Sequence, residues 1–485
     1  MVSIKQQMLS GVFYTAVAKY SSIIISLIVM AVLARLLHPG DFGVIAVATV
    51  IINFFNIFTN IGFSSAIIQN KELTSRDINN IYMFTIWLGI LLGILFFLSA
   101  RGIASYYNDK RLISICQLLS ISLFFSAIAI VPNTLFYKNK KFKFIAYRTF
   151  LIQLIVGIFS IIAALSGAGV YTLIIQPILS SILIFCVSLK KYPQKTQWVI
   201  GIKSVRKIWN YSIYQFLFNV VNYFTRNLDK LLIGKYMGMN LLGYYEKSYR
   251  LMMLPLQNIT YVITPVMHPI LSDYQNDMKK LAYSHERITH LLAFIGFPLG
   301  LALFFCSEEL VLCIFGSQWF PSIPVFKILS LTVGIQLVLS SSGPFYQAGN
   351  DTRGLLICGI FSAIVSVCAI LIGIFYFDSL EATAWCILIA FCLNFIQCYW
   401  QLYHFMFRRN ISFFYHQLLS PIILSFIIGC ILYFTSLLLT GQCNLVISLS
   451  LKSILSLLIW GTYIQLTQEY DIISKIKNIL LKLKK

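Results

Sequence analysis

The stretch LISICQLLSISLFFSAIAIVPNTLF occupies residues 112–136 and contains no charged side chain. As a helix it is long enough to cross the roughly 30 Å of hydrocarbon in a bilayer. Similar blocks recur along the chain, which has 485 residues, of which 59% are hydrophobic and only 11% charged. A soluble domain is typically about 25% charged. The sequence therefore predicts an all-α polytopic membrane protein.

The apolar blocks predict about fourteen transmembrane helices. The expected spans are 12–33, 42–68, 80–99, 112–136, 144–165, 170–189, 208–233, 242–268, 288–306, 323–346, 355–376, 382–406, 418–439 and 444–466. The first span is too long for a signal peptide and is followed by many similar ones, so we expect it to be a retained helix.

Two short motifs resemble each other. RLLHPGDFG at residues 35–43 follows the first span, and KYMGMNLLG at residues 235–243 follows the seventh, 200 residues further along. They suggest two six-helix halves in the same orientation, and transporters often bind substrate where such repeats meet. The predicted parts are an N-terminal six-helix lobe (1–189), a basic cytoplasmic linker (190–207), a C-terminal six-helix lobe (208–409), and two extra transmembrane helices with a basic cytoplasmic tail (410–485).

The charges are unevenly distributed. The chain has 37 lysines and arginines against 16 acidic residues, and most of the basic ones fall in segments on the same side as the two termini. The positive-inside rule then predicts a multi-pass protein of the cytoplasmic (inner) membrane with both termini cytoplasmic. Basic loops beside anionic lipid account for the net charge of +21 without any nucleic-acid partner.

The segment FTRNLDKLLIG, residues 224–234, places Arg226, Asp229 and Lys230 inside the seventh span. A charge at the bilayer centre costs at least ~2.5–3.5 kcal/mol. We therefore expect these side chains to face a water-filled cavity, with Asp229 paired to Arg226 and the cluster net positive. Two alternatives stay open, namely snorkelling to the outer interface and a purely structural ion pair between helices.

Polar stripes at helical spacing point to the same cavity. Asparagines of the second and seventh spans lie on one helical face each, although amides also hold membrane helices together. Lys19 fits a cavity or snorkelling toward the cytoplasm equally well. Arg250, with Glu246 and Lys247 at the start of the eighth span, fits an interfacial position better than a cavity. The candidate substrate-binding residues are Lys19, Asn53, Asn56, Asn60, Asn219, Asn222, Arg226, Asp229, Lys230 and Arg250. Together they predict a basic, amide-rich site.

Enzymatic chemistry is not indicated. The chain has no phosphate-binding glycine loop, nucleophile elbow or metal-ligand spacing, and its 11 cysteines fall mostly inside apolar spans. We expect no cofactor, no metal and no catalytic residue. Without an ATP-binding module, transport would draw on an ion gradient, the membrane potential or downstream consumption.

A family resemblance rests on six stretches. They are ARLLHPGDFG (34–43), NIGFSSAIIQ (60–69), RNLDKLLIG (226–234), YRLMMLPLQ (249–257), GSQW (316–319) and YQAG (346–349). The chain resembles the Wzx-type polysaccharide exporters, in the branch of lipopolysaccharide, colanic acid and teichuronic acid. These belong to the superfamily that also holds multidrug MATE exporters and lipid II flippases. The resemblance covers residues 1–410, with Pro-Gly-Asp in place of the commoner Pro-Glu-Asp after the first span.

The resemblance implies two six-helix lobes in a V shape around a central cavity, plus two C-terminal helices. It also implies a flippase that moves a polyprenyl-pyrophosphate-linked oligosaccharide from the cytoplasmic to the outer leaflet by alternating access. Arg226 and Lys230 would then receive the pyrophosphate, with Asp229 orienting them. Expected partners are this lipid, the bilayer, and polymerase and glycosyltransferases of the same pathway. A MATE-type ion-coupled small-molecule exporter, a lipid II flippase and a scaffold for glycosyltransferases remain as alternatives.

Overall fold

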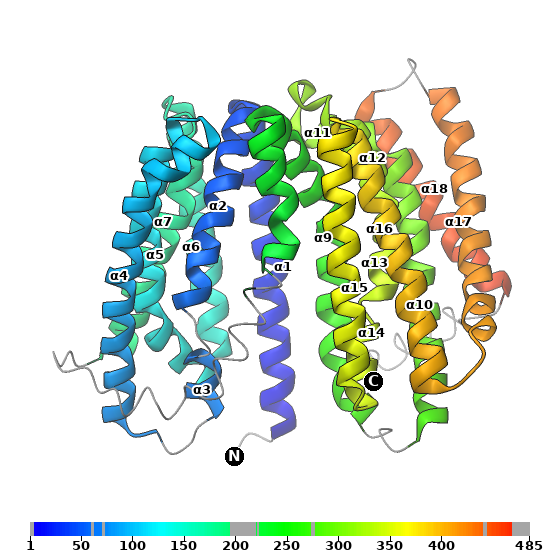
Figure 1. Ribbon diagram of the computed structural model, residues 1–485, viewed down its shortest axis with the longest axis horizontal. Coiled ribbons are helices and arrows are strands. Elements are labelled where there is room, and N and C mark those ends of the chain that lie inside the picture. The colour runs from blue at the N-terminus through cyan, green and yellow to red at the C-terminus, as the bar shows by residue number, and fades with distance from the viewer. Residues whose placement is uncertain are drawn as a thin grey trace, which may run out of the picture. The chain divides into compact units, whose positions relative to one another are not determined.

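A computed structural model describes residues 4–59, 63–69, 73–194, 220, 223–272, 277–439 and 444–467. All regular structure in these ranges is helical, and the chain forms two compact units, Met1–Glu246 and Lys247–Lys485 (Figure 1). Unit 1 contains α1 (Ile4–Leu36), α2 (Pro39–Thr59), α3 (Phe63–Gln69), α4 (Ser75–Tyr107), α5 (Arg111–Lys138), α6 (Phe142–Leu165), α7 (Tyr171–Lys191), helical residues 223–232 and the π-helical turn η1 (Ile233–Met237).

The helix α9 (Met239–Ser272) begins in unit 1 and continues into unit 2. Unit 2 further contains α10 (Met278–Phe305), α11 (Ser307–Phe315), η2 (Ser317–Trp319), α12 (Ser322–Ser330), α13 (Thr332–Leu339), α14 (Ser342–Ala348), α15 (Thr352–Leu371), η3 (Ile372–Tyr376), α16 (Leu380–Gln401), η4 (Leu402–Phe407), α17 (Ser412–Leu439) and α18 (Leu445–Thr467).

Eleven helices of the described chain are long and apolar enough to cross a membrane. A twelfth span results if Ser322–Ser330 and Thr332–Ala348, which meet at a bend of 42°, are counted together. The multi-pass helical class is thus confirmed. The expected span 208–233 lies mostly outside the described residues. The expected span 242–268 falls in α9, a single helix of 34 residues with charges near its start, and it is not among the eleven. The count of fourteen therefore stays a prediction.

Local sequence explains where the helices begin and end. Thr74 and Asp77 form a capping box at the start of α4, in which each side chain accepts a hydrogen bond from the backbone N–H of the other. The chain leaves α4 at Asn108 in the left-handed conformation. Gly238, with φ of 95°, separates η1 from α9, a backbone geometry that glycine adopts without strain.

Small residues let the helices of unit 1 approach closely. A Cβ on Gly89 of α4 would lie 2.9 Å from the Cβ of Ala127 on α5, and one on Gly157 of α6 would lie 2.7 Å from the Val29 side chain on α1. Ser122 of α5 donates to the carbonyl of Pro177 in α7 at 3.0 Å. These contacts are typical of membrane helices, which associate by close packing and hydrogen bonds.

In unit 2, α10 packs against α13 and α17. Gly296 of α10 lies directly against Gly334 of α13, where a Cβ would come within 3.0 Å of the neighbouring Cα. His285 is fully buried among aromatic rings, and its Nδ1 is 3.2 Å from the Tyr403 hydroxyl. The indole N–H of Trp460 on α18 donates to the Phe294 carbonyl at 2.8 Å, which fastens α18 to α10.

The two similar motifs contact each other reciprocally within unit 1. A Cβ on Gly43 would overlap the carbonyl oxygen of Met239, and a Cβ on Gly243 would overlap that of Pro39. Each contact becomes the other when 200 is added to or subtracted from its residue numbers. This is the self-complementary pattern expected of two copies related by a local two-fold axis.

The proposed division into lobes is not decided by this contact. Most of the expected linker 190–207 lies outside the described residues, which resume, apart from residue 220, at residue 223. The boundaries 1–189, 208–409 and 410–485 therefore remain predictions.

Candidate functional site

The helix at residues 223–232 runs antiparallel to α2. The Tyr223 hydroxyl donates to the Val50 carbonyl at 2.6 Å, and the ring centroids of Phe54 and Phe224 are 4.9 Å apart. At the other end of the contact, Gly234 lies against Val47. The structure therefore brings together the two spans in which the sequence places polar stripes.

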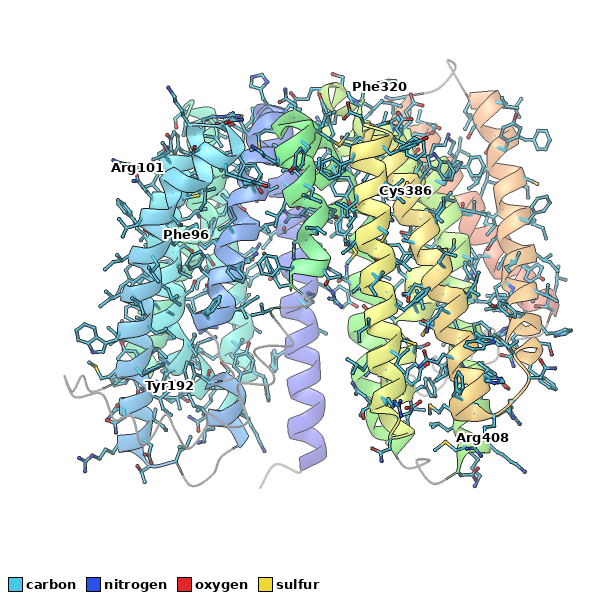
Figure 2. All side chains as sticks on the ribbon, in the orientation of Figure 1. Phe96, Arg101, Tyr192, Phe320, Cys386 and Arg408 are labelled. Carbon is cyan, nitrogen blue, oxygen red and sulfur yellow. The ribbon has the colours of Figure 1, made fainter. Side chains whose placement is uncertain are left out.

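Polar side chains at this pair of helices are accessible. Asn53 of α2 and Arg226 of the neighbouring helix are both exposed, and Asn56 is half-buried. Phe55, on another side of α2, packs 5.1 Å from the buried Phe96 of α4, which is labelled in Figure 2. α2 is thus held by aromatic contacts while Asn53 stays accessible.

Asp229 is buried and has a different partner from the expected one. It accepts a hydrogen bond from the Tyr245 hydroxyl at 2.6 Å and another from the backbone N–H of Lys230 at 2.8 Å. No hydrogen bond or ion pair joins it to Arg226 in the described residues. The predicted pairing of Asp229 with Arg226 is therefore wrong, because the two side chains differ in burial and Asp229 faces α9.

Lys230 is also partnered. Its ammonium nitrogen lies 2.7 Å from Oε2 of Glu246, and the two side chains are 15% and 23% exposed. Glu246 adds an acidic group that the sequence interpretation left at an interface. With Arg226, Asp229, Lys230 and Glu246 all ionised, the formal charges cancel. The expectation of a net positive cluster is corrected accordingly, and Arg226 is its exposed cation.

The remaining candidates are distributed over several elements. Lys19 is half-buried on α1, and Arg250 is exposed on the part of α9 that belongs to unit 2. Asn60, Asn219 and Asn222 lie outside the described residues. The substrate-binding role of the whole set remains a proposal.

Tyr245 and Glu246 are site residues that the sequence-based candidates do not include. They lie about as far after the turn at Gly238 as Asp229 and Lys230 lie before it. A helical hairpin that reverses at a left-handed glycine places such positions opposite each other. Treating 223–246 as a hairpin, rather than as two separate spans, would have paired them.

The described residues hold no group of three or more histidine, cysteine or acidic side chains that could bind a metal ion. What the site offers instead is one exposed guanidinium, an amide and a compensated set of buried charges. Such groups bind anions and hydroxyl groups.

Comparison with protein families matches residues 32–324 to the family described as polysaccharide biosynthesis protein. The chain belongs to this family. It is therefore a multi-pass membrane protein of a transport family of polysaccharide biosynthesis, and not an enzyme.

Several curated relatives are similar over most of their length. The teichuronic acid biosynthesis protein TuaB of Bacillus subtilis (strain 168) is 24% identical over 451 residues, which cover 90% of each chain. The lipopolysaccharide biosynthesis protein WzxC of Escherichia coli (strain K12) is 23% identical and covers 77% of this chain and 76% of its own. The succinoglycan biosynthesis transport protein ExoT of Rhizobium meliloti (strain 1021) is 20% identical with the same coverage, 77% and 76%.

Solved structures show the same fold. The lipid II flippase MurJ in an inward closed conformation matches with a TM-score of 0.76 at 16% identity, covering 94% of this chain and 98% of that chain. An inward-facing multidrug resistance transporter of the MATE family matches with a TM-score of 0.59 at 13% identity, covering 79% and 94%. The fold class of these transporters is thus confirmed for this chain.

Proposed function

We propose that the protein is a flippase for surface-polysaccharide assembly. It would move polyprenyl-pyrophosphate-linked oligosaccharide repeat units from the cytoplasmic to the outer leaflet by alternating access. The names of the relatives, two of which specify lipopolysaccharide and succinoglycan biosynthesis, support a saccharide substrate. The lipid II flippase fold supports a lipid-linked one.

One observation carries the proposal at the level of residues. Arg226 is an exposed cation on a helix that packs against α2, the helix that also carries the exposed Asn53. A cation in a membrane-spanning region is costly unless it meets water or an anion. A guanidinium can bind a pyrophosphate through two parallel hydrogen bonds, and Asn53 can hydrogen-bond to sugar hydroxyls.

We assign separate roles to the charged residues. Arg226 binds the pyrophosphate first. Lys230 binds it only after its ion pair with Glu246 has broken. Asp229 and Tyr245 hold the helical hairpin in place behind them. Lys19, Asn56 and Arg250, together with Asn60, Asn219 and Asn222, complete the proposed cavity between two six-helix lobes, with fourteen spans and both termini in the cytoplasm.

The decisive experiment is mass spectrometry of prenyl-linked oligosaccharides, with assignment of the leaflet, in cells carrying the gene or lacking it. We expect complete repeat units to accumulate on the cytoplasmic leaflet after deletion. Arg226→Gln should reproduce this accumulation and reduce flipping roughly ten-fold or more, because a charge-assisted hydrogen bond contributes about 1.5–3 kcal/mol.

Arg226→Lys, which keeps the charge, should retain part of the activity, and Arg101→Gln serves as a matched control at an exposed arginine of α4. Accumulation of lipid II instead would assign the protein to the cell wall. Unchanged lipids with normal polymer export would overturn the flippase proposal in favour of a small-molecule exporter.

A further inference from the structure

Arg148 is a buried cation that the proposed transport site does not use. It lies on α6, and only 7% of the residue is exposed to solvent. Nη1 donates to Ser188 of α7 at 2.8 Å, and Nη2 donates to the Asn133 side chain of α5 at 2.9 Å. Both acceptors are neutral, and Nε is buried without a hydrogen-bond partner in the described chain.

The charge of Arg148 is therefore not compensated by a carboxylate in the described residues. The Phe136 ring, 5.3 Å from the guanidinium carbon, offers a cation–π contact and no negative charge. Burying an unpaired ion in a protein costs several kcal/mol, which an anion nearby would reduce.

The surroundings add further positive charge. The sequence contains no aspartate or glutamate from Lys110 to Leu228. Exposed lysines gather at the ends of the three helices that hold Arg148. We call Arg148 and these lysines the basic end of unit 1; its members are Lys140, Lys141, Lys143, Arg148, Lys190 and Lys191.

The start of α4, which packs against α5, carries one acidic residue in the described part of the chain, Asp77. Asp77 at the start of α4 accepts hydrogen bonds from the backbone N–H and the hydroxyl of Thr74 at 3.1 and 2.9 Å. The basic end therefore has a positive potential that attracts anions. In Figure 2, Tyr192, which follows α7, lies at this end of unit 1, and Arg101 lies at the opposite end.

The apolar surface beside Arg148 indicates what kind of anion fits. Leu151, Leu154 and Ile158 of α6 are exposed and lie on one helical face with Tyr147. This stripe can lie along acyl chains, whereas a soluble anion would make no use of it. Basic pockets between membrane helices bind the headgroups of anionic lipids in this way.

We propose that the basic end of unit 1 is a binding site for one anionic glycerophospholipid. The exposed lysines contact its phosphate at the membrane surface, Arg148 compensates its charge from behind them, and the α6 stripe packs against its acyl chains. This site is separate from the proposed transport site and does not depend on the flippase function.

The test uses the full chain purified in a neutral detergent. Its melting temperature is measured during titration with phosphatidylglycerol or with phosphatidylcholine of the same acyl chains. Phosphatidylglycerol should raise the melting temperature saturably, because a ligand that binds only the folded state stabilises it, and phosphatidylcholine should not.

Variants locate the site. Lys141→Gln/Lys143→Gln removes two exposed charges and should weaken the apparent phosphatidylglycerol affinity at least about ten-fold, since each basic residue near an anionic lipid contributes about 1 kcal/mol. Arg101→Gln/Lys110→Gln removes two exposed charges elsewhere in the unit and should leave the affinity unchanged. Arg148→Gln should weaken it and Arg148→Lys should restore it in part.

Three results would overturn the proposal. Equal losses of phosphatidylglycerol affinity in the two double variants would show that the lipid is attracted by the overall positive charge and not by this site. An equal rise in melting temperature with phosphatidylcholine would show that the site does not distinguish the lipid headgroups. Displacement of phosphatidylglycerol by farnesyl diphosphate at lower concentration would assign the basic end to a prenyl diphosphate instead.

Discussion

Two lysine–glutamate ion pairs among the described residues differ in how deeply they are buried. In unit 2, Lys452 of α18 pairs with Glu309 of α11, and both side chains are almost fully buried, at 6% and 7% exposed. Ser448 also donates to Glu309 at 2.7 Å, and the Lys452 ammonium donates to the Phe305 carbonyl at 3.0 Å. In unit 1, Lys230 and Glu246 are 15% and 23% exposed and follow the exposed Arg226 in the chain.

Under the proposed function, the difference in burial separates a scaffolding ion pair from one that takes part in transport. The Lys452–Glu309 pair is buried and hydrogen-bonded to neighbouring helices, so we assign it the role of holding α18 against α11. The Lys230–Glu246 pair is open enough to exchange one partner for a ligand. Burial and partner geometry, and not the residue types, therefore decide which intramembrane charges are candidates for transport.

The largest effect should come from breaking the enclosed pair. Glu309→Gln leaves the Lys452 charge buried without a carboxylate and should destabilise unit 2 by about 3–5 kcal/mol. The measurement is the melting temperature of the purified protein. Glu308→Gln, at an exposed neighbour, is the control and should stay within ~0.5 kcal/mol.

A double variant sharpens the same point. Glu309→Leu with Lys452→Met removes both charges and should restore most of the stability, since an apolar replacement of a buried ion pair is often neutral. A double variant as unstable as Glu309→Gln would show that the pair specifies the position of α18.

The next largest effect is expected at Asp229, the buried carboxylate beside the Lys230–Glu246 pair. Tyr245→Phe removes the hydroxyl that donates to the buried Asp229 and should cost about 1–3 kcal/mol, the range for an unsatisfied buried group. Tyr106→Phe, at an exposed tyrosine of the same unit, is the control. Equal melting temperatures for the two variants would contradict the role of Tyr245 in the hairpin.

A smaller loss of stability is expected at the open pair itself. Glu246→Gln should change stability by less than about 1 kcal/mol, because a partly exposed ion pair contributes little. Flipping of the lipid-linked substrate should nevertheless change measurably, since Lys230 loses its partner. A stability loss like that of Glu309→Gln, with unchanged flipping, would place this pair among the scaffolding charges.

The smallest effect concerns Asp109, in the loop between α4 and α5. Burial raises its pKa, but hydrogen bonds and charge from Arg111 outweigh this and hold the pKa below its ordinary value. The carboxylate therefore stabilises the fold above about pH 4, and this contribution is lost as the pH falls through the folded-state pKa.

The Arg111 side chain is 45% exposed, so solvent limits the contribution of this pair to less than about 1 kcal/mol. Asp109→Asn should flatten the change in melting temperature between pH 6 and pH 3. An unaltered pH profile in this variant would show that other carboxylates account for the acid sensitivity.

Much of the protein follows from sequence alone. Apolar blocks such as 112–136 determine membrane helices whatever their neighbours, because an unpaired backbone cannot exist in hydrocarbon. α5, for example, is found at Arg111–Lys138. The motifs at 35–43 and 226–234 also indicate the family to which the chain belongs. They are short, local patterns that can be recognised before the fold is known.

Only the tertiary structure decided how the charges are partnered. Sequence spacing suggests that Asp229 meets Arg226, yet the turn at Gly238 brings Tyr245 to Asp229 and Glu246 to Lys230. Likewise, the reciprocal contact of Gly43 and Gly243 and the enclosure of Arg148 depend on residues far apart in the chain. The physical reason is that hydropathy is a property of one segment, whereas compensation of a charge requires a second segment whose position the fold alone provides.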